Sequence, residues 1–164
     1  MYQRLRKILH TVCHSQYQGF VLLALGLLVM SGPVSAKRTL LVMGDSLSAA
    51  YNLPAEQGWV ALTAKRMKTT HPDWTVANAS ISGETTSGGL SRMPAALKQH
   101  KPKLVIIELG ANDALRGLPL ELSRRNLQSM IRQSKAAGAK VLLIGMQMPP
   151  NYGKAYTDGF VNNY

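Results

Sequence analysis

The chain has 164 residues and a formal net charge of +11, with 19 Lys and Arg against 8 Asp and Glu. Its single cysteine excludes a framework of disulfides, and its length fits one domain with a sizeable core. The positive charges are scattered, which favours an ordinary solvated surface over a nucleic-acid interface. Weak attraction to anionic lipid headgroups stays open as a second interpretation of the charge.

The first 36 residues are typical of a secretory signal peptide, because basic residues precede an apolar run over 20–30 and small residues then lead to Ala36. An uncleaved membrane anchor is the alternative, but eleven apolar residues are fewer than the roughly 20 that a spanning helix needs. We therefore expect cleavage after Ala36 and export to the periplasm or the medium. The mature domain, 37–164, would keep a charge of +8 and lose Cys13.

Four short apolar runs alternate with helical patterns, which is typical of βαβ units around a parallel sheet. In chain order the pattern predicts a strand over 39–43, a helix over 58–70, a strand over 74–79, a helix over 86–99, a strand over 104–108, a helix over 120–137 and a strand over 141–145. Pro94 predicts a kink or a late start in the second helix. A further helix is expected to begin at Ala155, and no fifth strand follows it.

Chemically active residues follow the first three predicted strands. The first strand ends in Gly44-Asp45-Ser46 and is expected to turn into a helix, which would present the Ser46 hydroxyl at the rim of the sheet. Gly83 follows the second strand and Asn112 the third. If the second and third strands flank the first, their carboxyl ends share one edge and these loops converge on Ser46. The Ser46 and Gly83 amides and the Asn112 side chain would then form an oxyanion hole.

Each of these residues also has an ordinary structural interpretation. Asp45 and Ser46 could cap a helix, and Gly83 could serve a turn. Asn112 and Asp113 could bond local backbone. Taken singly these interpretations are favoured, but their occurrence together on three successive strand ends favours a catalytic site.

Three sequence blocks, Gly44-Asp45-Ser46-Leu47, Ser82-Gly83-Glu84-Thr85 and Gly110-Ala111-Asn112-Asp113, resemble the first three signature blocks of the SGNH, or GDSL, hydrolases. The resemblance is to a branch of multifunctional acyl-CoA thioesterases and lysophospholipases exported to the periplasm of Gram-negative bacteria. It implies an α/β fold, a three-layer αβα sandwich with a flavodoxin-like parallel sheet. It also implies that Ser46 is the nucleophile, that Gly83 and Asn112 complete the oxyanion hole, and that no metal or organic cofactor is used.

The family's fourth block, Asp-x-x-His, supplies the base and is not found in this sequence. His71 and His100 both precede strands, so they are expected at the opposite edge of the sheet, roughly 17 Å from Ser46. A carboxylate is a poor substitute, because its ordinary pKa makes it a weak base toward serine. The carboxylates near the Ser46 edge are Asp45, Glu84, Glu108, Asp113 and Asp158. We therefore expect a C-terminally truncated or frame-shifted member that lacks the last strand and helix.

Two functions stay open from the sequence. The first is a serine esterase or thioesterase acting on fatty acyl substrates (aryl esters, lysophospholipids and acyl-CoA) through an acyl-enzyme on Ser46, with impaired activity because the base is missing. The second is a non-catalytic exported domain that binds acyl chains or anionic lipid. In either case we expect a monomer that does not bind nucleic acid.

Overall fold

The structure is a computed structural model that describes residues 37–164, which form one compact unit. The predicted signal peptide, its cleavage site and Cys13 lie outside the described residues. None of the helices described is long and apolar enough to cross a membrane.

Four parallel strands form the sheet of this unit, in the order β2-β1-β3-β4. Their bounds are β1 Arg38–Gly44, β2 Trp74–Asn78, β3 Leu104–Glu108 and β4 Lys140–Leu143. The second and third strands therefore flank the first, as the convergence of the loops requires. The register pairs Val42 with Asn78 and Gly44 with Glu108, so the carboxyl ends of these three strands lie at one edge.

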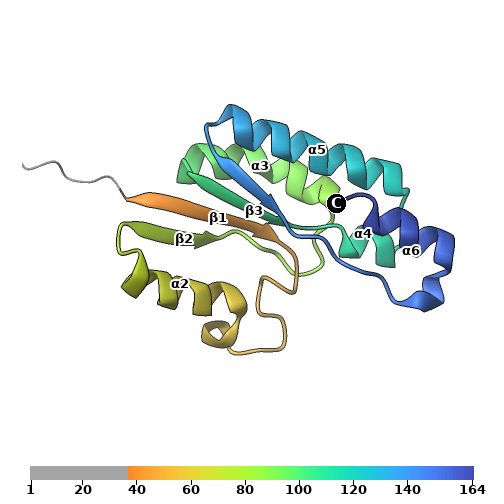
Figure 1. Cartoon of the computed structure of the whole chain (residues 1–164), viewed down its shortest axis with the longest axis horizontal. Coiled ribbons are helices and arrows are strands. Elements are labelled where there is room, and N and C mark those ends of the chain that lie inside the picture. The colour runs from red at the N-terminus through yellow and green to blue at the C-terminus, as the bar shows by residue number, and fades with distance from the viewer. Residues whose placement is uncertain (1–36) are drawn as a thin grey trace, which may run out of the picture. The chain divides into compact units, whose positions relative to one another are not determined.

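Helices cover both faces of the sheet and make a three-layer sandwich (Figure 1). Helix α2 (Trp59–Thr70) lies on one face, and α3 (Thr86–His100) and α5 (Leu120–Ala136) lie side by side on the other. The core is divided accordingly, because side chains of a strand alternate between the two faces. Leu41, Met43, Val105 and Ile107 pack with α3 and α5, whereas Leu40, Val42 and Ile106 pack with α2.

Short helices lie beyond the carboxyl ends of the strands. They are η1 (Ala55–Gln57), α4 (Ala111–Leu115), η2 (Pro150–Tyr152) and α6 (Lys154–Val161). The α6 residue Phe160 is buried against Ala114 of α4 and Met148. Tyr164 stacks edge-on against Phe160, and its hydroxyl donates a hydrogen bond of 2.8 Å to the carbonyl of Leu109. The helix expected from Ala155 is thus present as α6, and no fifth strand follows it within residues 37–164.

Two local predictions were wrong. The second helix does not start late, because α3 begins at Thr86 and continues past Pro94 to His100, with Met93, Ala96 and Leu97 buried on both sides of the proline. The chain after Ser46 does not turn into a helix either. Residues 46–52 form turns, and the first α-helix begins only at Trp59.

Most predicted bounds differ from the observed ones by one or two residues. The largest difference is at β4, where the prediction ran to Gly145 but the assigned strand stops at Leu143. Ile144 still donates a hydrogen bond to the carbonyl of Ile107, so backbone bonding to β3 extends one residue past the assigned end of β4. At this edge Leu142 keeps half of its surface exposed, at 50%.

Candidate active site

The loop after β1 places Ser46 at the edge of the sheet. The preceding residue, Asp45, is buried, and its carboxylate accepts a hydrogen bond from the Leu47 amide, which fixes a tight turn. A further bond from the Ala49 amide to the Asp45 carbonyl closes one helical turn that is not continued. Ser46 itself is half-buried, and no hydrogen bond joins its hydroxyl to another residue of the described part. The alternative that Asp45 and Ser46 cap a helix is wrong, because residues 46–52 form turns, and Asp45 instead bonds the local backbone of this turn.

The loop after β2 brings Gly83 to the same edge. It runs beside the end of β1, because the Ile81 amide donates to the Gly44 carbonyl at 3.0 Å. Gly83 has a φ of +78°, a left-handed conformation that favours glycine. Two arginines hold this loop: Arg116 donates to the Gly83 carbonyl at 2.9 Å, and Arg92 bonds both the Glu84 carboxylate and the Ala79 carbonyl. Gly83 serves a turn and also exposes its backbone at the candidate site.

Asn112 joins the three loops. It lies in α4, and its side-chain nitrogen donates to the Asp45 carboxylate at 3.1 Å and to the Glu84 carbonyl at 2.9 Å. These partners are 67 and 28 residues away in sequence, so the alternative interpretation, local backbone bonds, is wrong for Asn112. The amide of one side chain thereby ties the end of β1 to the loop after β2.

Asp113, the next residue, has a structural role. Its fully buried carboxylate accepts hydrogen bonds from the backbone amide and hydroxyl of Thr86 and from the hydroxyl of Ser123. It therefore fixes the start of α3 against α5, because the first amides of a helix have no partner within the helix. The local-backbone interpretation is wrong here as well.

A third buried carboxylate, Glu108, lies beneath the turn that carries Ser46 and Ser48. Its Oε2 accepts a hydrogen bond of 2.7 Å from the Ser48 hydroxyl, while Oε1 has no partner among the described residues. Burial raises the pKa of Glu108, against the hydrogen bond from Ser48, and the nearby Asp45 carboxylate raises it further. Burial likewise raises the pKa of Asp45.

Gly44 makes this arrangement possible. A Cβ at this position would lie 2.7 Å from the Ser48 Oγ and 2.9 Å from the Ser80 Oγ. Only glycine leaves room for the two hydroxyls above the end of β1. No local sequence pattern predicts the link between Ser48 and Glu108, because it joins residues that are 60 positions apart.

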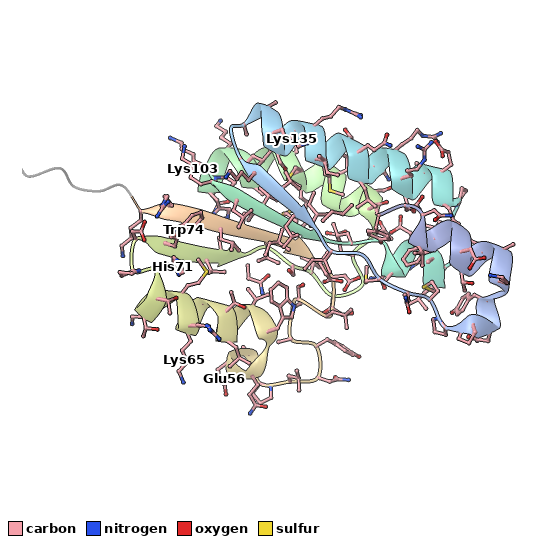
Figure 2. The ribbon with its side chains drawn as sticks, viewed as in Figure 1. Glu56, Lys65, His71, Trp74, Lys103 and Lys135 are labelled. Carbon is pink, nitrogen blue, oxygen red and sulfur yellow. The ribbon has the colours of Figure 1, made fainter. Side chains whose placement is uncertain are left out.

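Neither histidine of the described residues lies near Ser46. His71 directly follows α2 and lies three residues before the first residue of β2, and His100 ends α3 shortly before β3. Figure 2 shows His71 beside Trp74, at the amino ends of the strands. Both imidazoles are therefore at the sheet edge opposite Ser46, as predicted.

The carboxylates considered as substitutes for the base form hydrogen bonds or ion pairs with other residues. Glu84 forms an ion pair with Arg92 at 2.7 Å, and Asp158 pairs with Lys154 on exposed α6. Within residues 37–164 no group of three or more His, Cys, Asp or Glu side chains could hold a metal ion.

Each of the three loops also exposes an apolar side chain. Leu47 is 63% exposed, Ile81 47% and Leu115 52%. Leu47 adjoins Ser46, Ile81 bonds the end of β1, and Leu115 lies in the same short helix as Asn112. An apolar surface thus accompanies the polar groups at the candidate site, as is usual for sites that bind small organic ligands.

Comparison with known proteins agrees with this geometry. The sequence profile of the GDSL-like Lipase/Acylhydrolase family matches residues 42–164. The chain belongs to this family. The match to the GDSL-like family includes all three loops of the candidate site.

Other members of the GDSL-like family are similar over most of the chain. Esterase TesA of Pseudomonas aeruginosa is 53% identical over 137 residues, which cover 84% of this chain and 68% of the relative. Thioesterase 1/protease 1/lysophospholipase L1 of Escherichia coli K12 is 42% identical over 134 residues, or 82% of this chain and 63% of the relative. The chain thus spans about two thirds of the length of these relatives.

The fold is also shared with a solved member of the family. The crystal structure of TesA superposes with a TM-score of 0.75 at 54% sequence identity, covering 77% of this chain and 71% of that one. The four-stranded parallel sheet and its flanking helices are therefore those of a GDSL-like hydrolase.

Proposed function

We propose that this chain is a serine esterase and thioesterase domain in which Ser46 is the nucleophile. The observation that carries the proposal is the double hydrogen bond of Asn112, at 3.1 Å to Asp45 and 2.9 Å to the Glu84 carbonyl. It assembles three strand-end loops around one serine with a free hydroxyl. Membership of a lipase and acylhydrolase family adds independent support.

In the proposed reaction the Ser46 oxygen attacks an acyl carbonyl carbon and loses its proton to a base, while the carbonyl oxygen becomes an oxyanion. The Ser46 and Gly83 amides and the Asn112 side chain would donate to that oxyanion. Both hydrogens of the Asn112 amide have protein acceptors, so stabilisation of an oxyanion exchanges one of these bonds. The alcohol or thiol then leaves with a proton, and water releases the acid from the acyl-enzyme.

The proposed substrates are fatty acyl esters and thioesters. The exposed side chains of Leu47, Ile81 and Leu115 offer apolar surface beside Ser46 for an acyl chain. The names of the relatives, an esterase and a thioesterase 1/protease 1/lysophospholipase L1, point to the same class. Aryl esters, lysophospholipids and acyl-CoA are the compounds that we would test.

We further propose that the 164-residue polypeptide turns over slowly. The two histidines of residues 37–164 lie at the far edge of the sheet, so neither of these two imidazoles can take the Ser46 proton. Serine proteases that lose triad members keep roughly 10³–10⁴-fold catalysis over water through the oxyanion hole and substrate binding. A small residual activity is therefore expected.

The second candidate is a non-catalytic domain that binds acyl chains or anionic lipid. It is favoured by the lack of an imidazole near Ser46 within residues 37–164 and by the +8 charge of these residues. For either function we propose export, cleavage after Ala36, a mature domain over 37–164 and a monomeric state.

The variant Ser46→Ala distinguishes the serine hydrolase from the non-catalytic binding domain. Hydrolysis of p-nitrophenyl esters and labelling by a fluorophosphonate probe should occur in the unmodified chain and disappear in Ser46→Ala. Ser91→Ala is the matched control, because Ser91 is exposed on α3 and bonds only a carbonyl of its own helix. Absence of Ser46-dependent turnover and labelling, with unchanged binding to anionic vesicles in Ser46→Ala, would reject the enzyme and support the binding domain.

A further inference from the structure

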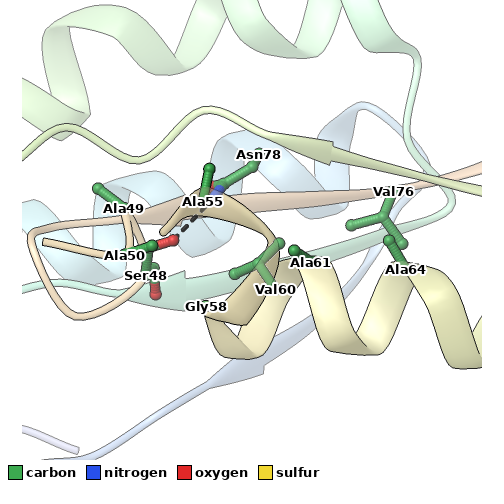
Figure 3. A pocket seen from close by; sticks show the side chains of 10 residues that line it. All are labelled: Ser48, Ala49, Ala50, Ala55, Gly58, Val60, Ala61, Ala64, Val76 and Asn78. Carbon is green, nitrogen blue, oxygen red and sulfur yellow. Dashed lines mark hydrogen bonds between the residues drawn. The ribbon is translucent and has the colours of Figure 1, made fainter. Parts of the chain in front are cut away.

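A cavity of about 220 Å³ lies between α2, the end of β2 and the turns that follow Ser46. Figure 3 shows Ala61 and Ala64 of α2 facing Val76 of β2 across it. Most of the lining is small and apolar: Ala49, Ala50, Ala55, Gly58, Val60, Ala61, Ala64 and Val76. None of the residues proposed for the reaction is part of this lining.

The two polar residues of the cavity already have partners. The Asn78 side chain donates to the Ser48 carbonyl at 2.8 Å and accepts from the Ser80 amide at 3.1 Å. The Ser48 hydroxyl donates to Glu108. A bound molecule would therefore meet mostly apolar side chains, so a polar group placed deep in the cavity would lose bonds to water with little replacement.

The size of the cavity limits what it can hold. An apolar cavity of about 150 Å³ is enough to bind benzene, whereas the pockets that bind drug-sized ligands measure roughly 300–1,000 Å³. The space thus fits a short alkyl chain or a ring of similar size. A headgroup would have to remain outside, in water.

We propose that this cavity binds the short alkyl chain of a small amphiphile, with the polar end in solvent. The site is additional to the proposed reaction at Ser46 and does not depend on it, because no lining residue takes part in that reaction. It adjoins the serine turn, however. Ala50 of this turn has a left-handed φ of +56° and packs so closely on Gly58 that a Cβ at Gly58 would lie 2.6 Å from the Ala50 Cβ.

The test uses the full chain, methyl-labelled for NMR, with 1-hexanol as the probe. Saturable binding is expected, with intermolecular NOEs from the hexanol chain to the methyl groups of Ala61, Ala64 and Val76. Hexane-1,6-diol is the matched ligand, because its second hydroxyl would be buried without a partner. It should bind about tenfold more weakly, and hexanoate should give the same NOEs as hexanol if the alkyl chain alone is recognised.

Filling the cavity should remove the binding. The double variant Ala61→Leu with Ala64→Leu should weaken hexanol about tenfold or more, since it occupies the volume of several methylenes. Ala95→Leu on the exposed side of α3 is the matched control and should leave binding unchanged. The NOEs of the unmodified chain keep the test valid if the double variant fails to fold. NOEs confined to Leu47, Ile81 or Leu115, equal binding of the diol, or no saturable binding would each overturn the proposal.

Discussion

The side-chain amide of Asn112 donates a hydrogen bond of 3.1 Å to the carboxylate of Asp45, across 67 residues of sequence. The same nitrogen bonds the Glu84 carbonyl, so this one side chain links the turn of Ser46 to the loop of Gly83. Asn112 is therefore a proposed oxyanion donor and also a structural link between loops. These two roles can be separated by experiment.

Replacement Asn112→Ala should lower Ser46-dependent ester hydrolysis about 100-fold, because removal of one oxyanion donor has costs of this order in other hydrolases. It should also destabilise the chain by about 1 kcal/mol through the two lost hydrogen bonds. Urea unfolding and initial rates with p-nitrophenyl butyrate measure the two effects. Asn151→Ala in exposed η2 is the control and should change neither. Full turnover in a folded Asn112→Ala protein would contradict the oxyanion role.

Glu108 should make stability depend on pH. Folding raises its pKa above the ordinary value of 4.5, chiefly through burial, so the folded state holds this proton more tightly than the unfolded state. The contribution of Glu108 to the free energy of unfolding is then greatest at low pH and falls as the pH rises from 4.5 through the raised pKa. Glu108→Gln keeps an oxygen for the Ser48 hydroxyl and removes the charge, so it should remove this loss of stability.

The measurement is urea unfolding of the unmodified chain and of Glu108→Gln between about pH 4 and pH 7. The free energy of unfolding of the unmodified chain, relative to the variant, should decrease across this range. Glu121→Gln is the control, because Glu121 lies on the surface with 51% of its side chain exposed. Parallel pH profiles for the unmodified chain and Glu108→Gln would show that Glu108 is not the cause.

The buried carboxylate of Asp113 should contribute strongly to stability. Asp113→Ala leaves the Thr86 amide and the hydroxyls of Thr86 and Ser123 without their acceptor, so a loss of about 3 kcal/mol is expected. Asp158→Ala removes only the exposed ion pair with Lys154 and should cost less than about 1 kcal/mol. Urea unfolding distinguishes the two variants, and equal losses would contradict the assigned role of Asp113.

Much of the fold could be predicted because buried parallel strands are nearly continuous apolar runs. Leu104–Glu108 is the clearest example, with four of its five residues buried, and its predicted bounds are those observed. Strand ends also located Ser46, Gly83 and Asn112, since the chain leaves every parallel strand at the same edge. Local pattern and topology were sufficient for these features.

The remaining features depend on contacts between distant parts of the chain. The short helix α4 has only five residues, too few for a periodic pattern, and its position depends on the bonds of Asn112 and Asp113. Pro94 is tolerated in α3 because packing of Met93 and Leu97 outweighs the lost backbone bond. Arg92 of α3 and Arg116, which follows α4, bond backbone carbonyls of the Gly83 loop, and no local sequence signal predicts these bonds.

The left-handed conformation of Gly83 allows a sharp test of the proposed site. Gly83 and Gly138 have similar φ values, +78° and +81°. A Cβ added at Gly83 would lie 3.8 Å from a side-chain nitrogen of Arg116, and one added at Gly138 would have no neighbour within 4 Å. Each change to alanine should therefore cost about 1 kcal/mol in backbone strain, seen as similar shifts in urea unfolding. Gly138 lies between α5 and β4, away from the Ser46 edge. Hydrolysis and fluorophosphonate labelling should fall in Gly83→Ala, because the added Cβ hinders the close approach of a substrate oxygen to the amide. Both should stay unchanged in Gly138→Ala. If both variants lose activity in proportion to their lost stability, the Gly83 amide is not part of an oxyanion hole.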